Sequence, residues 1–236
     1  MSPSRQYARA GERGPILDDA TIGTAEEMDG PPAIDAIRIG MHETWITPGS
    51  VTAARAAFAR APAILLRRVV DADLRAFMID RCATRPFAGQ TRPALDGHRW
   101  VEKQPRLLSK AMMAAVGRPA MLRWIEQVTG CGPLQSVTGQ LAETRPGAGD
   151  FLPWHQDVFD DFRRVAITID LSDQPFEGGA FEMRDKASGA LLLRHFYEGD
   201  GSALIYAMTD DTEHRVLPIT AGGPRRVFSA WFRGVE

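Results

Sequence analysis

The chain has 236 residues, of which 44% are hydrophobic and 25% charged, and its formal net charge is −2 at pH 7. This composition is typical of one large soluble domain, and the charge argues against nucleic acid or an anionic membrane surface as a partner. No apolar stretch approaches the roughly 18 residues that a membrane span requires.

The N-terminal residues include no apolar segment of the kind found in secretory signals. The two cysteines, Cys82 and Cys131, lie far apart in the sequence and form no zinc-binding or disulfide pattern. We therefore expect a cytoplasmic protein with reduced thiols. The sequence makes no prediction of the oligomeric state.

Residues 1–35 differ in composition from the rest of the chain. Prolines and glycines interrupt this segment, and Tyr7 is its only aromatic residue. Because such a segment buries little apolar surface, we expect a mobile N-terminal arm, with draping over the domain as the alternative. Residues 36–236 are then expected to form a single domain.

The first part of this domain is predicted to be mainly helical. Ser50 is expected to cap a helix that ends before Pro62, and Asp71 to cap a second helix. The segment AILLRRVV, residues 63–70, lies between them and is a candidate for a short buried strand.

Two further helices are predicted from the placement of proline and glycine. Residues 105–117 and 118–130 each begin near a proline and end at a glycine, as helices often do. The polar segment 89–104 carries turn residues, so it is expected to be a loop or a hairpin.

From about residue 134 the hydrophobic pattern changes to a period of two. Residues 164–172, RVAITIDLS, place Val165, Ile167, Ile169 and Leu171 on one face of a strand and polar or small residues on the other. Further short strands are expected at residues 178–185, 190–196, 202–207 and 226–232. This order indicates an α+β protein with a β-sandwich or barrel core and helices buttressing one face.

The candidate site begins with the motif His155-x-Asp157. Residues two apart share one face of an extended chain, and His214 follows 57 residues after Asp157. Two imidazoles and one carboxylate form the facial triad of non-haem iron(II) oxygenases, which leaves coordination positions open. A lone histidine is more often structural, and His42 and His195 are interpreted in that way.

The C-terminal part of the chain resembles the 2-oxoglutarate/Fe(II)-dependent oxygenases, particularly the prolyl-hydroxylase-like branch. The resemblance is carried by residues 214–232, HRVLPITAGGPRRVFSAWF, and by residues 170–185, where a Gly-Gly pair precedes an apolar strand. It covers roughly residues 134–233.

The resemblance implies a double-stranded β-helix, a jelly-roll or cupin-like core over residues 134–233, with helical support from residues 50–130. It also implies that His155, Asp157 and His214 are the metal and catalytic residues. Fe(II), 2-oxoglutarate and O₂ would be the cofactor and cosubstrates, with ascorbate as a stimulant.

A basic residue in this family holds the far carboxylate of 2-oxoglutarate. Arg225 stands at the family's position for this residue when the spacing is counted back from Trp231. Counted forward from His214, however, Arg225 comes one residue late, so Arg226 is an alternative. Thr144 stands where many members have a tyrosine, and it is expected to contact the cosubstrate together with Gln140. Thr168 and Ser229 are further candidates for lining the barrel.

The reaction implied is oxidative decarboxylation of 2-oxoglutarate to succinate and CO₂, coupled to oxidation of a substrate C–H bond. Because halogenase relatives have a small residue at the carboxylate position, Asp157 favours hydroxylation over halogenation. Desaturation and ring formation remain open.

The substrate is left open as a small molecule, an amino acid or a peptidyl residue. The polar segment contains His98, Arg99, Trp100 and Lys103, which suit a small charged ligand, and Asp160-Asp161 and Arg163-Arg164 could flank the mouth of the site. One alternative is a non-catalytic cupin-like module that binds metal, although a structural zinc normally takes four protein ligands. Another is an iron oxygenase that does not use 2-oxoglutarate.

Overall fold

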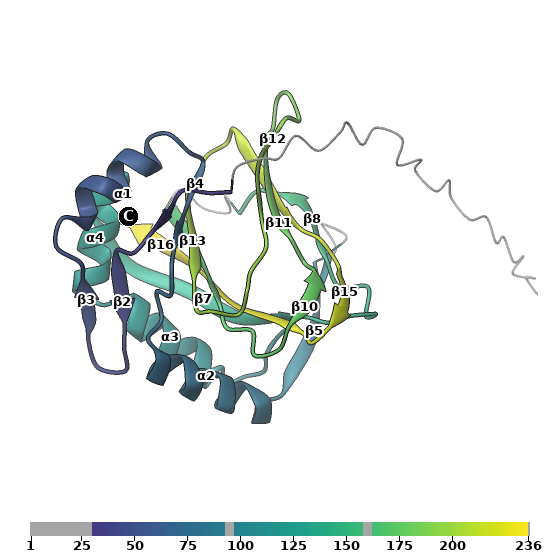
Figure 1. Cartoon of the computed structure of the whole chain (residues 1–236). Coiled ribbons are helices and arrows are strands. Elements are labelled where there is room, and N and C mark those ends of the chain that lie inside the picture. The colour runs from purple at the N-terminus through teal and green to yellow at the C-terminus, as the bar shows by residue number, and fades with distance from the viewer. Residues whose placement is uncertain (1–29, 93–96, 158–161, 236) are drawn as a thin grey trace, which may run out of the picture.

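The computed structural model describes residues 30–92, 97–157 and 162–235. Two β-sheets face each other, and helices cover the outer side of the larger sheet (Figure 1). The α+β jelly-roll fold expected from the sequence is thereby confirmed. The helices and the inner face of the smaller sheet each bury one face of the larger sheet.

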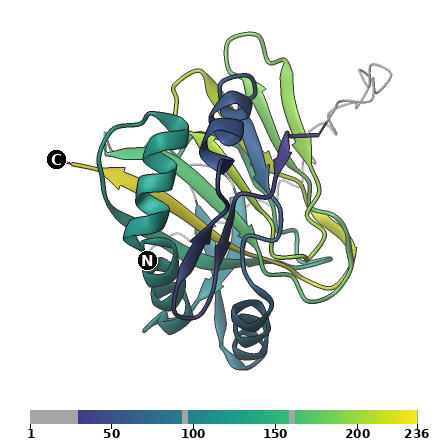
Figure 2. The same ribbon diagram turned by 60° about the vertical axis from the view of Figure 1, so that its left-hand side comes forward.

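The larger sheet has eight strands in the order β1-β4-β13-β9-β16-β7-β6-β5. In chain order its strands are β1 (Ala33–Ile34), β4 (Ala63–Leu66), β5 (Phe87–Arg92), β6 (Gly97–Glu102), β7 (Leu134–Thr144), β9 (Arg163–Asp170), β13 (Ala203–Ala207) and β16 (Arg225–Gly234). Strand β16, yellow in Figure 2, runs across the molecule and pairs with both β7 and β9.

The smaller sheet has four strands in the order β12-β11-β14-β8. These are β8 (Leu152–His155), β11 (Phe181–Asp185), β12 (Leu191–His195) and β14 (Thr212–Val216). Two antiparallel pairs complete the strands: the hairpin of β2 (Ile37–Ile39) with β3 (Thr44–Ile46), and the pairing of β10 (Phe176–Gly178) with β15 (Ile219–Gly222), which are distant in the sequence.

The described residues form four helices: α1 (Ser50–Phe58), α2 (Ala72–Thr84), α3 (Leu107–Val116) and α4 (Pro119–Thr129). Asp71 caps α2 as predicted, because its carboxylate accepts a hydrogen bond of 2.8 Å from the Leu74 N–H. The prediction for Ser50 was wrong. Gly49 is the N-cap residue of α1, and the Ser50 hydroxyl instead accepts a hydrogen bond from the buried Trp124 indole.

Strand β9 shows why the chain separates into two cores. Val165, Ile167, Ile169 and Leu171 belong to the large core between the helices and the larger sheet. Ala166 points to the other side, into a second core between the sheets that includes Phe181, Leu204 and Trp231. The predicted alternation is therefore confirmed, and it places Thr168 and Asp170 on the inner side with Ala166.

Residues 50–130 also contribute strands to the larger sheet. The polar segment at 89–104 forms most of the hairpin β5–β6, in which Phe87 pairs with Glu102 and Arg92 with Gly97. Strand β6 then joins β7 through the pairs Trp100–Glu143 and Val101–Ala142. The N-terminal half of the domain thus extends the sheet as well as covering it.

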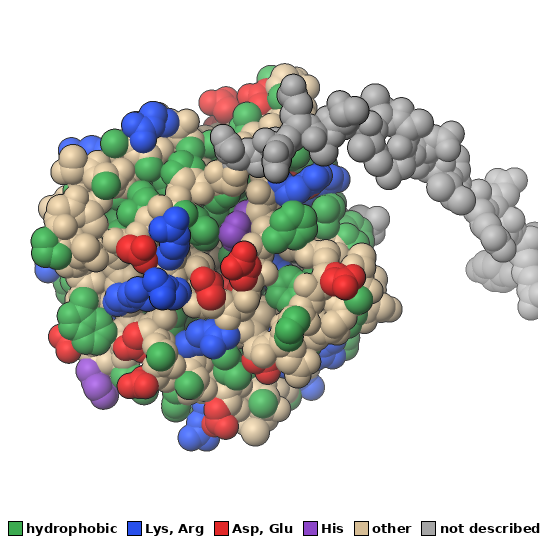
Figure 3. All heavy atoms as spheres, viewed as in Figure 1, with side chains coloured by type: hydrophobic (Ala, Val, Ile, Leu, Met, Phe, Trp, Pro, Cys, Tyr) green, Lys and Arg blue, Asp and Glu red, His purple; other side chains and the backbone are tan. Residues whose placement is uncertain are grey.

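Residues 1–29 of the predicted arm lie outside the described residues, while Ala33 and Ile34, near its end, form β1. Within the part of the chain that is described, no helix is long and apolar enough to cross a membrane. On the face shown in Figure 3, positive and negative side chains are interspersed.

Candidate active site

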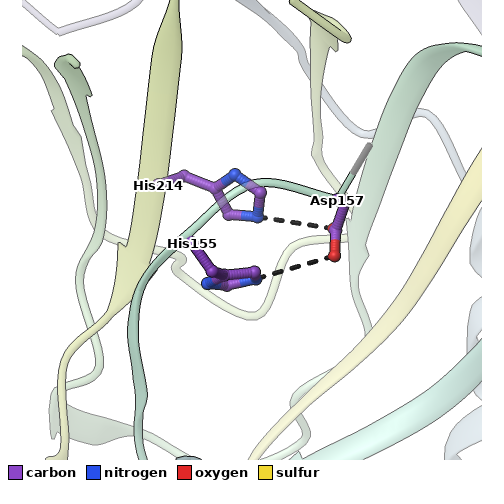
Figure 4. A group of neighbouring side chains, drawn as sticks. All are labelled: His155, Asp157 and His214. Atoms are coloured by element: carbon purple, nitrogen blue, oxygen red, sulfur yellow. Dashed lines mark ion pairs between the residues drawn. The ribbon is translucent and has the colours of Figure 1, made fainter. Parts of the chain in front are cut away.

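Three potential metal ligands meet between the two sheets. His155 ends β8 and pairs directly with His214 on β14, and Asp157 follows two residues after His155 (Figure 4). Asp157 Oδ1 lies 3.7 Å from His155 Nε2, and Asp157 Oδ2 lies 3.5 Å from His214 Nε2. All three residues are buried.

The geometry of the three side chains fits one metal ion. One ligand atom from each residue lies within 4.8 Å of the others. Metal–ligand bonds of about 2.1 Å would bring such atoms to about 3 Å apart, which requires only small side-chain shifts. His155 Nδ1 lies 2.7 Å from the carbonyl oxygen of Pro153, so this nitrogen carries the proton and Nε2 offers its lone pair toward Asp157.

Aromatic side chains enclose His214. The ring of Phe181 stacks against it with centroids 5.4 Å apart, and the ring of Tyr206 lies at 5.3 Å. Burial, followed by the negative charge of Asp157, raises the pKa of the Tyr206 phenol well above its ordinary value. The phenol therefore stays protonated and can act as a hydrogen-bond donor beside the ligands.

The residues adjacent to the ligands point away from them. Trp154 is held on the outer side between two guanidinium groups, Arg184 at 4.3 Å and Arg215 at 4.5 Å from its ring centroid. The Gln156 amide donates to the carbonyl oxygens of Asp210 and Thr212 and accepts from Lys186. These contacts fix the backbone on both sides of His155.

A cavity lies beside the three ligands, which form part of its wall. Its wall includes the predicted residues Thr144, Thr168, Arg225 and Ser229, together with Arg99 from the hairpin β5–β6. Gln140 is buried but is not among the lining residues, so the structure does not place it with Thr144 at the cavity.

Arg225 is the buried cation of this cavity on β16. It is 3% exposed, and its Cα pairs with that of Thr144. Arg225 Nε and Thr144 Oγ1 are both buried and have no hydrogen-bond partner among the described residues. Two orphaned polar atoms side by side are costly unless a ligand satisfies them, and a carboxylate matches both.

Neighbouring residues keep the Arg225 side chain in place. The Tyr197 ring lies under the guanidinium, with 4.7 Å from the guanidinium carbon to the ring centroid. Gly179 has φ +64°, and a Cβ at this position would lie 3.2 Å from Arg225 Cδ. A Cβ there would also clash with Ile219 Cδ1, so Gly179, the second glycine of the Gly-Gly pair, leaves room for Ile219 and for the arginine.

Arg226 points to the opposite side of the sheet. Its guanidinium pairs with Glu143 at 2.7 Å and with Asp173 at 2.8 Å. Because successive residues of a strand face opposite sides, only one of the two arginines can reach the cavity, and the structure places Arg225 there.

The hairpin residues singled out in the sequence separate in the structure. Arg99 lines the cavity. His98 instead pairs through Nδ1 with Asp150 at 2.5 Å. The ring of Trp100 packs against the guanidinium of Arg145, whose carbon lies 3.9 Å from the ring centroid. Lys103 is exposed. Asp160 and Asp161 lie outside the described residues.

The same part of the chain matches a known family. Residues 139–233, which span all three candidate ligands and Arg225, match the 2OG-Fe(II) oxygenase superfamily. The match covers the segment of the chain whose strands carry the candidate site. Fe(II), 2-oxoglutarate and O₂ are accordingly the cofactor and cosubstrates of this dioxygenase. No curated protein sequence matches the chain.

Solved structures of other oxygenases have the same fold. A prolyl-4-hydroxylase from Pseudomonas putida is 23% identical, with a TM-score of 0.59 over 79% of this chain and 100% of that one. A 2OG-Fe(II) oxygenase family oxidoreductase from Burkholderia pseudomallei is 14% identical, with a TM-score of 0.60 over 83% of this chain and 95% of that one. The epimerase SnoN of nogalamycin biosynthesis is 16% identical, with a TM-score of 0.56 over 80% of this chain and 84% of that one. At these identities the likeness concerns the fold alone.

Sequence reasoning missed two aromatic residues of the oxygenase site. Tyr206 lies on β13, within a segment that reads only as an apolar strand. Tyr197 lies beyond the end of β12, outside the strand pattern. Tyr206 pairs with Ala166, which shares the inner face of β9 with Thr168, so side-chain alternation could have placed Tyr206 on that face once the pairing of β13 with β9 was known. Nothing in the sequence points to Tyr197.

Proposed function

We propose that the protein is an Fe(II)- and 2-oxoglutarate-dependent hydroxylase that acts on a C–H bond of a small molecule, an amino acid or a peptidyl residue. His155, Asp157 and His214 would hold the metal, and Arg225 and Thr144 would bind the far carboxylate of 2-oxoglutarate. The observation that carries this proposal is the orphaned pair Arg225 Nε and Thr144 Oγ1 in the cavity beside the ligands.

When bound, Fe(II) and 2-oxoglutarate would supply oxidative decarboxylation, in which O₂ is the oxidant: one oxygen atom enters succinate as CO₂ is released, and the other hydroxylates the substrate. The chain's own residues prepare the site for it. Pro153 fixes the tautomer of His155, and the Tyr206 phenol stays neutral next to Asp157. Arg225, buried and restrained by Tyr197, orients the cosubstrate so that its other end reaches the ligands.

The proposal includes a single oxygenase domain over residues 36–236 with an N-terminal arm, and a cytoplasmic location. Both cysteines are free thiols, which supports a reducing compartment.

The test is succinate release by purified protein supplied with Fe(II), ascorbate and 2-oxoglutarate. We expect slow turnover without added substrate, and its loss in His155→Ala and in Asp157→Ala. Full activity in either variant would contradict the ligand assignment. Metal binding without any succinate release in the wild type would instead favour the non-catalytic, cupin-like module.

A further inference from the structure

Tyr197 lies directly behind the guanidinium group that faces the cavity. The Arg225 guanidinium carbon is 4.7 Å from the Tyr197 ring centroid, and Arg225 lines the cavity beside the metal ligands whereas Tyr197 does not. Seen from the cavity, the ring therefore forms the layer behind the guanidinium. Because protein interiors are close-packed, the ring limits how far the guanidinium can withdraw from the cavity.

Tyr197 also lines a second hollow, whose wall does not include Arg225. This wall contains Tyr197 together with His195 and Phe196, which precede it, and Leu65 of β4. Among the described residues, the walls of the cavity and of the second hollow have no residue in common. The Tyr197 ring therefore stands between the guanidinium and the second hollow. Removing the ring would open space into which the guanidinium could withdraw.

The ring is held in this position from several sides. Tyr197 is 5% exposed, and the His195 ring packs edge-on against it with centroids 4.6 Å apart. Two residues later, the Gly199 N–H donates to the Asp170 carboxylate, and the Gly199 carbonyl oxygen accepts a hydrogen bond from Arg75 of α2. The backbone that follows Tyr197 is thus tied to β9 and to a helix, which limits movement of the ring.

The polar surroundings draw the guanidinium toward the ring. The buried Asp170 carboxylate, which does not line the cavity, interacts electrostatically with Arg225 and is fixed by the Ser172 N–H at 3.0 Å. Burial raises the pKa of the Tyr197 phenol above its ordinary value, so the phenol is neutral beside Arg225 and the Thr168 hydroxyl. Asp170 therefore attracts the guanidinium from behind the wall, and the neutral ring limits how far it moves.

We propose that the Tyr197 ring fixes the depth of Arg225 and thereby selects the chain length of the 2-oxo dicarboxylic acid that serves as cosubstrate. This inference rests on the proposed function, in which the metal holds the keto-acid end and Arg225 holds the far carboxylate. The spacing of these two anchors must match the length of the acid. A guanidinium that cannot withdraw therefore discriminates against an acid one methylene longer. Tyr197 acts as a positioning residue, since it contacts Arg225.

The test compares 2-oxoglutarate with 2-oxoadipate, which has the same keto-acid end and one additional methylene group. Their dissociation constants are measured by calorimetry on Mn(II)-loaded protein, so that no turnover is required. Because the metal-binding end is common to both acids, the ratio of the two constants reports on the far end alone. We expect the wild type to bind 2-oxoglutarate about tenfold or more tightly than 2-oxoadipate, a discrimination typical of one methylene.

Two substitutions separate the ring from its hydroxyl group. Tyr197→Ala should reduce the preference to about threefold or less, mainly by tightening the binding of 2-oxoadipate, because the guanidinium gains room to withdraw. Tyr197→Phe should keep the preference, since it keeps the ring. If Tyr197→Ala does not fold, as judged by Mn(II) binding, Tyr197→Val leaves a smaller gap and should still lower the preference.

Phe196→Ala is the matched control. It removes the neighbouring aromatic ring, which is 54% exposed and lines the same second hollow, and it should keep the preference of the wild type. A loss of preference in Phe196→Ala equal to that in Tyr197→Ala would point to general loosening of this loop and would overturn the proposal.

Other outcomes are also decisive. If Tyr197→Ala weakens both acids alike and leaves their ratio unchanged, the ring contributes to affinity and does not select chain length. A wild type without any preference, or a Tyr197→Phe variant that loses it, would equally contradict a role for the ring. If neither acid binds to the Mn(II)-loaded wild type, the proposed function itself fails.

Discussion

The indole Nε1 of Trp231 donates a hydrogen bond of 3.2 Å to Oδ2 of Asp157. Asp157 is thereby held by a residue of the larger sheet, although it directly follows β8, a strand of the smaller sheet. Arg163 reinforces this contact. Its guanidinium lies 4.1 Å from the Trp231 ring centroid and donates to the Asp157 carbonyl oxygen at 3.0 Å. The indole N–H therefore sets the orientation of the carboxylate that completes the ligand set.

Replacing Trp231 with Phe should weaken metal binding more than it weakens the fold. Phe fills most of the same space but lacks the N–H, so we expect about a tenfold or greater rise in the Fe(II) dissociation constant, the usual effect of losing a hydrogen bond to a ligand. Anaerobic Fe(II) titration measures this, with thermal unfolding of the metal-free protein as the check on stability. Trp154→Phe, on the outer side of the smaller sheet, is the control and should bind Fe(II) normally.

The two adjacent arginines should differ sharply in their effect on 2-oxoglutarate. Arg225→Ala removes the buried guanidinium that β16 contributes to the cavity and should raise the 2-oxoglutarate dissociation constant by about a hundredfold, the cost of losing a buried charged pair. Arg226→Ala should change it little, because that side chain pairs with Glu143 and Asp173 instead. Calorimetric titration of both Mn(II)-loaded variants decides the matter, and the reverse order would move the anchor by one residue.

Glu102 is predicted to be a major stabilising residue of the domain. Its buried carboxylate accepts hydrogen bonds from the Leu108 and Ser109 N–H groups and from the Ser109 hydroxyl, at 2.9, 2.8 and 2.6 Å. Since α3 has no side-chain cap of its own, Glu102→Ala should lower the free energy of unfolding by about 3 kcal/mol. Urea denaturation measures the loss. Glu102→Gln, which keeps one acceptor oxygen, should lose less.

His195 should make the protein sensitive to acid. Burial, followed by the positive charge of Arg225, lowers the pKa of His195 from 6.5 to about 4. As the pH falls below 6.5, the unfolded chain takes up this proton first, so the stability contributed by the neutral imidazole is present above pH 6.5 and is lost toward pH 4. The loss would reach at most about 3 kcal/mol.

The measurement is the free energy of unfolding between pH 7 and pH 4, compared in wild type and His195→Asn. The variant should show a shallower decline over this interval, whatever its stability at pH 7. His42→Asn, at an exposed turn between β2 and β3, should decline as steeply as the wild type. An identical slope in His195→Asn would show that this imidazole is not the acid-sensitive group.

Much of the architecture could be predicted from short-range patterns. Alternation in β9 correctly separated the helix-facing residues from the inner ones, because neighbouring side chains of a strand must point to opposite sides. The Asp71 cap was correct for a similarly local reason, since its partner is the N–H of Leu74. The prediction that Ser50 caps a helix failed because its hydroxyl instead accepts a hydrogen bond from Trp124, which is distant in the sequence.

The sequence by itself determined which residue types could form the site: the His155-x-Asp157 pair on one extended segment, a distant His214, and one of two arginines. Only the tertiary structure showed which of Arg225 and Arg226 lines the cavity, because alternation separates their directions without saying which side of β16 faces it. Tertiary structure likewise placed Arg99 in the cavity wall and the Trp231 indole against Asp157. Such contacts depend on strand register and on the packing of one sheet over the other, and these arise from the whole chain, beyond any local period of the sequence.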